Sequence, residues 1–312
     1  MTGTNIDRNV LRLKKTICSV LLLTGLIIFG IRISQEIADS VIFGMRLAVE
    51  KVLPSSFPFM VLADFYVAYG HPENLRALRF IASRALGIPT EAISAFVCGN
   101  IGGFPIGAHI TADLYKSSII DRKNAERLVA ISSNPSIAFI MGGVGLGMYE
   151  SLSIGYILII SVYFSMLITS LILKSNQLKS KNSVNIFMQN YDFTRSIKKT
   201  GASCISLIAI ISIFSAFISI AKKYIKSSVA LILIASVSEV TNAVYLSSES
   251  NLPLYIKIAI SAFALGFGGL SVMLQSASFF ADTDVKFKKY ILFKLLQGMI
   301  SAAVSLLIYL IL

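Results

Sequence analysis

One carboxylate stands out among the polar residues because it lies within a strongly apolar segment. Glu239 has no basic residue within ten positions, and its neighbours Ser238, Thr241 and Asn242 are all polar. An ionisable group in an apolar segment is costly unless it faces a cavity or a partner. Glu239 therefore predicts a polar site, where it would bind a solute or a coupling proton.

Other polar side chains lie in separate apolar segments. Each of them either contacts a polar solute or bonds to a neighbouring helix, and the sequence leaves both interpretations open. His109 lies four residues before Asp113, a spacing that favours a structural pair on one helix face. The candidate substrate-binding residues are Asn100, Phe104, His109, Ser133, Asn134, Glu239, Thr241, Asn242, Ser271 and Gln275.

The same residues argue against an enzyme. The glycine-rich run 143–147 lies within an apolar segment, without the strand and helix of a nucleotide-binding loop. The chain has two histidines and three cysteines with no CxxC pair, so we expect no metal site, no cofactor and no disulfide framework. No serine or cysteine has a base at a recognisable spacing, so we expect no catalysis.

These polar residues must be positioned by membrane helices. Hydrophobic residues make up 55% of the 312 and charged residues only 14%, against about 25% in soluble domains. The net charge of +12 falls mainly in loops beside apolar segments, which the positive-inside rule explains better than nucleic-acid binding does. We therefore predict an all-α polytopic protein of the cell membrane, with the lipid bilayer as its partner and no nucleic acid.

The chain contains nine apolar segments of roughly spanning length. They are 16–30, 53–70, 92–112, 128–149, 152–173, 203–221, 228–247, 255–281 and 290–312. The basic N-terminus and the basic stretch 174–200 predict a cytoplasmic location for both. The segment 33–52 mixes charged and apolar residues at helical spacing, which predicts an interfacial amphipathic helix.

The segment 92–112 cannot be a simple crossing, because basic residues flank it on both sides. It is interrupted by Gly99, Gly102, Gly103, Pro105 and Gly107, which should break a helix. Broken backbone at membrane depth needs protein or a water-filled cavity to satisfy it. We predict a re-entrant hairpin that enters and leaves on the cytoplasmic side.

The second half repeats this order of elements in the opposite orientation. Segment 228–247 is interrupted by polar residues around Glu239, and a glycine-rich span and a plain span follow it. Lys286, Lys288, Lys289 and Lys294 would then lie on the cytoplasmic side. We predict inverted repeats over 32–174 and 175–312, preceded by an extra transmembrane helix in 1–31. The lysines at 222, 223 and 226 would face outward, against the charge rule.

Several short motifs occur between residues 47 and 275. They are Leu-Pro-Ser-Ser-Phe-Pro-Phe (53–59), Gly-Asn-Ile-Gly-Gly-Phe-Pro-Ile-Gly-Ala (99–108), Asn-Ala-Glu-Arg-Leu (124–128), Ser-Asn-Pro (133–135), Ser-Glu-Val-Thr (238–241) and Ala-Leu-Gly-Phe-Gly-Gly-Leu-Ser-Val (264–272). These motifs resemble those of the nucleoside recognition, or Gate, domain family, and most of all its YlbJ-type sporulation integral membrane proteins.

The resemblance implies a membrane protein needed for spore formation, similar in plan to Gate domains of transport systems. Inverted repeats with interrupted helices are a design of secondary transporters, whose site lies near the midplane between the repeats. We expect a small polar solute or ion to bind there, and a second copy of the chain is a further candidate partner. The alternative is a non-transporting membrane component required for spore envelope assembly.

Overall fold

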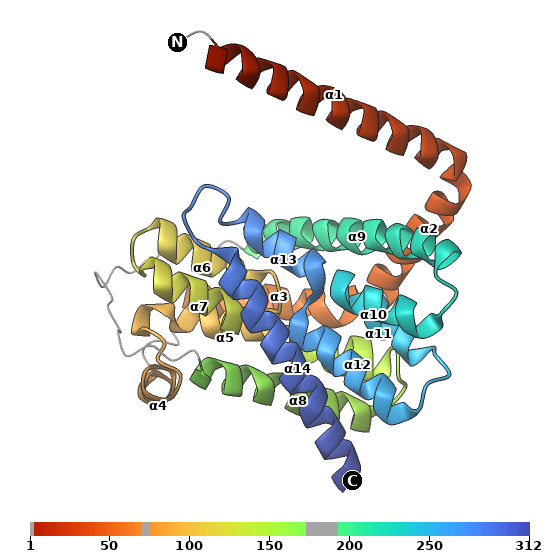
Figure 1. Cartoon of the computed structure of the whole chain (residues 1–312). Helices are drawn as coiled ribbons and strands as arrows, with labels where there is room; N and C mark the ends of the chain where they lie inside the picture. Colours follow the sequence, from red (N-terminus) through yellow and green to blue (C-terminus); the bar gives the residue numbers. More distant parts are fainter. Residues whose placement is uncertain (1–2, 70–74, 173–192) are drawn as a thin grey trace.

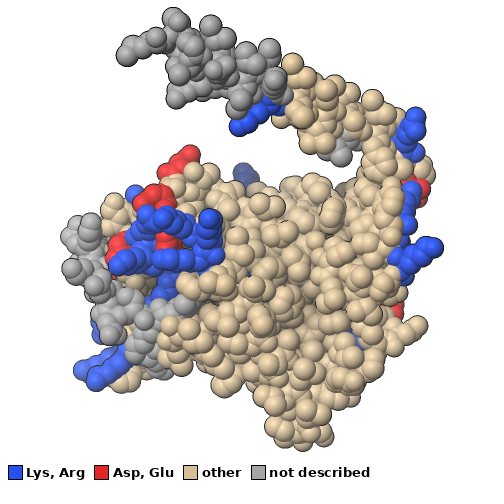
Figure 2. Space-filling view, viewed as in Figure 1, with Lys and Arg blue, Asp and Glu red and all other residues tan. Residues whose placement is uncertain are grey.

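The computed structural model describes residues 3–69, 75–172 and 193–312, and it is helical throughout, with no strand among these residues. Among these described residues, five helical segments are long and apolar enough to cross a membrane, which confirms the prediction of an all-α polytopic membrane protein. Their candidate spans are Lys15–Arg32, Leu152–Ile172, Ser196–Tyr224, Leu254–Ser278 and Phe287–Ile311. Figure 2 shows charged side chains gathered mainly at two opposite ends of the molecule, with a broad uncharged surface between them.

Helix α1 (Gly3–Arg32) extends away from the other helices (Figure 1). Between Ile17 and Ile31 the apolar side chains that the structure describes are exposed, and Leu21, for example, has 67% of its surface accessible. A helix that exposes this much apolar surface is stable in lipid, where each backbone polar group bonds within the helix. This arrangement agrees with the extra N-terminal transmembrane helix predicted from the sequence.

Helices α2 (Ser34–Leu47) and α3 (Leu53–Tyr69) are joined by a π-helical turn (Ala48–Val52) without leaving helical geometry. They run antiparallel to α9 (Phe193–Tyr224). Glu36 at the start of α2 forms an ion pair with Lys223 at the end of α9, and Asp64 in α3 forms one with Lys199 in the first part of α9. A Cβ atom on Gly44 would lie 2.6 Å from the Cα of Ser212, in the middle of the α9 span.

The segment 33–52, predicted as an interfacial amphipathic helix, packs along the candidate span of α9. Small residues let the two helices approach closely, as is common between membrane helices, and the interfacial location stays a prediction. The ion pair between Glu36 and Lys223 also places both residues at the same end of the molecule. This pair offsets one of the lysines that the charge rule disfavours there. The basic stretch 174–200 lies largely outside the described residues.

The first interrupted segment folds as a helical hairpin, as predicted for 92–112. It follows three short elements, α4 (Arg76–Phe80), a π-helical turn (Ile81–Ala85) and a 3-10 turn (Thr90–Ala92). Helices α5 (Ile93–Gly102) and α6 (Ile106–Lys116) pack against each other around a turn at 103–105. Their backbones approach so closely that a Cβ atom on Gly99 would lie 2.7 Å from the Cα of Gly107.

A second interruption lies where a single span was predicted over 128–149. Helix α7 (Arg122–Ser132) ends before Pro135, and the chain resumes as a π-helix (Phe139–Leu146), followed by α8 (Leu152–Ile172). Proline lacks the N–H that a continuing helix would need, and it disfavours helical geometry in the residue before it. Ser136 then accepts a hydrogen bond from the Phe139 N–H at 3.1 Å, which caps the new helix.

The second half contains two more interruptions. The predicted one, in 228–247, is a single extended residue, Glu239 (φ −153°, ψ 126°), between α10 (Ser228–Ser238) and α11 (Val240–Ser248). The other divides the segment 255–281, predicted as one span, into α12 (Leu254–Phe267) and α13 (Gly269–Ser278). Gly268 and Gly269 have φ values of +84° and +76°, which residues other than glycine rarely adopt.

Helix α14 (Phe287–Ile311) ends the chain and packs against α8 and α12. Each half thus contains three segments in the same order, namely an interrupted pair (α5 and α6, or α10 and α11), a second interrupted segment and a long unbroken helix (α8 or α14). This order is what the repeat hypothesis requires. The assignment of 32–174 and 175–312 as inverted units remains a prediction.

Candidate functional site

The four interruptions meet in one region of the molecule. The Phe104 N–H donates a hydrogen bond to the Asn134 carbonyl oxygen at 3.0 Å, which joins the interruption in the first hairpin to the one after α7. A Cβ atom on Gly269 would lie 3.0 Å from the carbonyl oxygen of Ser238, so the last two are also in contact. A Cβ atom on Gly268 would lie 3.9 Å from the Phe104 ring, which links the two pairs.

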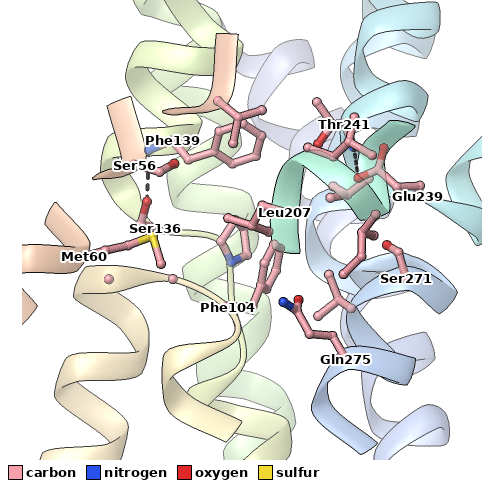
Figure 3. Close-up of a pocket in the computed structure, with 18 residues that line it drawn as sticks. Ser56, Met60, Phe104, Ser136, Phe139, Leu207, Glu239, Thr241, Ser271 and Gln275 are labelled. Atoms are coloured by element: carbon pink, nitrogen blue, oxygen red, sulfur yellow. Dashed lines mark hydrogen bonds between the residues drawn. The ribbon is translucent and has the colours of Figure 1, made fainter. Parts of the chain in front are cut away.

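A small cavity of about 40 Å³ lies at this meeting point (Figure 3). Its walls come from α3, the turn at 103–105, the 133–136 break, α9, the Glu239 break and α13. Five of the ten candidate residues line it, namely Phe104, Glu239, Thr241, Ser271 and Gln275. The structure therefore brings together side chains from both halves of the chain, as the midplane hypothesis requires.

Glu239 is 2% exposed and does two things at this site. Its carboxylate caps α11 by accepting hydrogen bonds from the Thr241 N–H at 2.9 Å and the Asn242 N–H at 2.7 Å. It also accepts one from the Asn242 side-chain amide at 2.8 Å. The positive end of a helix dipole and three donors stabilise a buried negative charge, so Glu239 needs no basic partner.

Other polar atoms of the cavity remain available for a ligand. Ser271 is 3% exposed, and its hydroxyl has no hydrogen-bond partner among the described residues. The Gln275 side chain extends toward Phe104 (Figure 3). A buried hydroxyl without a partner is costly, because its desolvation is not compensated. A bound water, ion or polar solute would supply the missing partner.

Three candidate residues form a second polar cluster, next to the cavity. The Asn134 side-chain amide donates to Asn100 Oδ1 at 3.0 Å, and Asn134 Oδ1 accepts from Lys294 Nζ, also at 3.0 Å. The carbonyl oxygen of Ser133 accepts from the same ammonium at 2.9 Å. Gln297 completes the cluster by donating to Asn134 Oδ1 at 2.7 Å.

Two of the predicted site residues lie elsewhere. His109 faces Asp113, with 3.8 Å between Nε2 and Oδ2, and its ring centre lies 5.0 Å from that of Phe279. The structural pair favoured by the spacing is therefore present. Asn242 does not line the cavity, but its side chain lies behind Glu239, where its amide donates to the Glu239 carboxylate and its Oδ1 accepts from the Ser215 hydroxyl, both at 2.8 Å.

Two residues at the site are absent from the candidates predicted from the sequence. Lys294 was predicted to lie on the cytoplasmic side with the other lysines of 286–294, but its side chain is fully buried. This burial arises because α14 packs against α7 and α8 and carries Lys294 into the interior, while the cytoplasmic location of the 286–294 lysines stays a prediction. Ser136 lines the cavity as well, and its place directly after the Ser-Asn-Pro motif was the only available signal.

Ionic contacts hold the two halves together at the end of the molecule where α6 and α7 meet the 279–286 loop. Tyr115 and Arg122 both donate hydrogen bonds to Asp284, and Arg122 also pairs with Glu126 at 2.9 Å. Lys289 approaches Glu126 to 2.9 Å. Within the described part of the chain, no group of three or more His, Cys, Asp or Glu side chains is placed to hold a metal ion.

A comparison with known proteins agrees with this architecture. The chain is 25% identical over 309 aligned residues to the sporulation integral membrane protein YlbJ of Bacillus subtilis (strain 168). The alignment covers 85% of this chain and 76% of the relative. Over most of its length the chain is thus similar to an integral membrane protein of sporulation. No family model matches the chain, and no solved structure matches it.

Proposed function

We propose that this protein binds a small polar solute or ion in the cavity around Glu239, and that it moves this ligand across a membrane during sporulation. Its two halves, 32–174 and 175–312, would act as inverted Gate-like repeats with the ligand between them. The similarity to a sporulation integral membrane protein supports the setting, and the resemblance of the motifs to the Gate family supports the transport role.

The observation that carries this proposal is the meeting of four helix interruptions around one buried carboxylate. Interrupted helices cost backbone hydrogen bonds at membrane depth, so a fold that needed only stability would avoid four of them. Transporters use such breaks to point helix ends and free carbonyl groups at a ligand. The unpartnered Ser271 hydroxyl beside Glu239 supports a ligand at this point.

The size of the cavity limits the ligand in this conformation. A volume of about 40 Å³ holds a few waters or a small ion, since one water needs roughly 10 to 15 Å³. Pockets for larger organic ligands measure roughly 300 to 1,000 Å³. A nucleoside-sized solute would therefore require the halves to separate, whereas an inorganic ion or a solute of a few atoms would not.

The test combines uptake with complementation. Purified protein in liposomes would be assayed with a panel of inorganic ions and small polar solutes, using wild type, Glu239→Gln and the control Glu249→Gln, whose carboxylate is exposed at the end of α11. We expect uptake of a panel member by wild type and the control, and none by Glu239→Gln. The same variants would be expressed in Bacillus subtilis lacking its relative.

Normal sporulation with Glu239→Gln at normal abundance, together with no uptake by any protein, would contradict the proposal. That result would favour the alternative, a membrane component of spore envelope assembly that transports nothing.

A further inference from the structure

Lys294 is the most unusual charged residue of the described structure, because it is fully buried in the middle of the protein without an acidic partner. Its side chain is 0% exposed, and no carboxylate of a described residue lies within 4.0 Å of its nitrogen. A buried charge is expensive unless it is fully hydrogen-bonded. Its surroundings must therefore compensate for the missing counter-ion.

Three neutral oxygen atoms provide that compensation. Lys294 Nζ donates to the Ser133 carbonyl at 2.9 Å, to Asn134 Oδ1 at 3.0 Å and to Gln297 Oε1 at 2.9 Å. An ammonium group has three N–H donors, and all three are used here, whereas a neutral amine would have only two. The arrangement of acceptors therefore matches the charged form of the side chain.

The helix dipole adds to this match. Ser133 directly follows the last residue of α7, and the carbonyl groups at a helix C-terminus carry partial negative charge and lack helical partners. A cation is favoured at such a position. The break after α7 thus leaves the Ser133 carbonyl oxygen without a helical partner, and the Lys294 ammonium of α14 donates a hydrogen bond to it.

We propose that the oxygen atoms of Ser133, Asn134 and Gln297 form an ammonium-binding site, which the chain fills with its own Lys294. The site fixes the break between α7 and the following π-helix. It also acts on the cavity, because the Asn134 carbonyl holds the Phe104 N–H at 3.0 Å. Lys294 therefore stabilises the break that borders the cavity, and this role stands whether or not the cavity transports a solute.

The test replaces the tethered ammonium with a free one. Lys294→Ala removes three methylenes and the ammonium, and propylammonium carries those same groups. Purified Lys294→Ala would be melted in propylammonium, potassium or tetramethylammonium chloride at equal concentration. The control is Lys288→Ala, because Lys288 is an exposed lysine on the same helix.

We expect Lys294→Ala to melt at least about 5 °C below wild type. Propylammonium should recover half or more of this difference, while potassium and tetramethylammonium should not, because neither has N–H groups to donate. Lys288→Ala should melt like wild type in every salt. An equal rise with all three cations, or no rise with propylammonium, would overturn the proposal.

A second variant covers the case in which Lys294→Ala does not accumulate. Lys294→Met keeps most of the side-chain volume but has no donor for the three oxygen atoms. It should melt at least about 5 °C below wild type and should not respond to propylammonium, because the space is filled. A Lys294→Met protein as stable as wild type would overturn the ammonium site.

Discussion

Phe104 and Asn134 join two interrupted helices that are separate in the sequence, through the hydrogen bond from the Phe104 N–H to the Asn134 carbonyl oxygen. Each residue also faces a different polar centre. Phe104 lines the cavity that contains Glu239, and Asn134 accepts from the Lys294 ammonium. A displacement of either break should therefore disturb both centres.

Gly103 allows the first of these breaks, so its replacement should be severe. Its φ of +80° disfavours any side chain, and a Cβ atom would lie 2.9 Å from the backbone nitrogen of Ser136. We expect Gly103→Ala to destabilise the protein by roughly 2 kcal/mol or more, from strain at this positive φ and steric overlap. Thermal melts and membrane abundance would measure this loss.

The matched control is Gly201→Ala in α9. A Cβ atom at this position has no other atom within 4 Å, and alanine favours a helix over glycine by about 1 kcal/mol. The control should be as stable as wild type or more so. If Gly103→Ala were equally well tolerated, the close contact between the two breaks would not be needed for folding.

The fold could be predicted where a break had an unusual composition. Four glycines and a proline within 99–107 identify the first hairpin, and the cluster of polar residues around Glu239 identifies the third interruption. The breaks at 133–136 and at Gly268 did not stand out, because a single proline and a short glycine run also occur in intact membrane helices. Only the packing of the other helices around them decides that the backbone leaves the helix there.

The site was predictable in part for the same reason. Glu239 is conspicuous because a carboxylate is rare in an apolar segment, and Thr241, Ser271 and Gln275 follow from their polarity. Lys294 escaped notice because Lys286, Lys288 and Lys289 precede it, so it resembled one more basic residue at a membrane boundary. Which face of α14 turns inward depends on contacts with α7 and α8, which end at Ser132 and Ile172, far from Phe287 in the sequence.

The capping role of Glu239 predicts a graded effect of its replacement on stability. Glutamine keeps one acceptor oxygen. Its NH₂ group would replace the other oxygen and would face an N–H that donates to the carboxylate in the wild type. We expect Glu239→Gln to lose about 1 to 2 kcal/mol of stability and to remain in the membrane. Glu239→Ala, which removes all three acceptor contacts, should lose more.

Thermal melts of both variants beside Glu249→Gln would measure these differences. Glu249 is exposed, and its replacement should change stability by less than about 0.5 kcal/mol. If both Glu239 variants were as stable as wild type, the carboxylate would not be the cap of α11.

The predicted orientation can be tested with single cysteines in a background without Cys18, Cys98 and Cys204. Ser117 follows α6 at the end of the molecule predicted to be cytoplasmic, and Asn251 lies in the exposed loop between α11 and α12. A membrane-impermeant thiol reagent added to intact cells should label Asn251→Cys only. Ser117→Cys should react only after the cells are opened. Labelling of both from one side would contradict the inverted arrangement.

The ionic contacts between the two halves predict sensitivity to acid. The hydrogen bond from Tyr115 and the charge of Arg122 lower the pKa of Asp284 below its ordinary value. Burial would raise the pKa of Glu126, but hydrogen bonds from Lys289, Arg122 and the Lys286 N–H lower it overall. A carboxylate with a lowered pKa stabilises the folded state above its unfolded pKa, and this contribution is lost as the pH falls through the folded value.

Thermal stability should therefore fall as the pH decreases below about 4, the ordinary range of a carboxyl group. Asp284→Asn should melt lower than wild type at pH 6, but its melting temperature should depend less on pH between 6 and 3, because one of the two groups no longer titrates. Asp282→Asn, at an exposed position two residues away, is the control and should behave like wild type. An unchanged pH profile in Asp284→Asn would mean that its contacts with Tyr115 and Arg122 do not hold the two halves together.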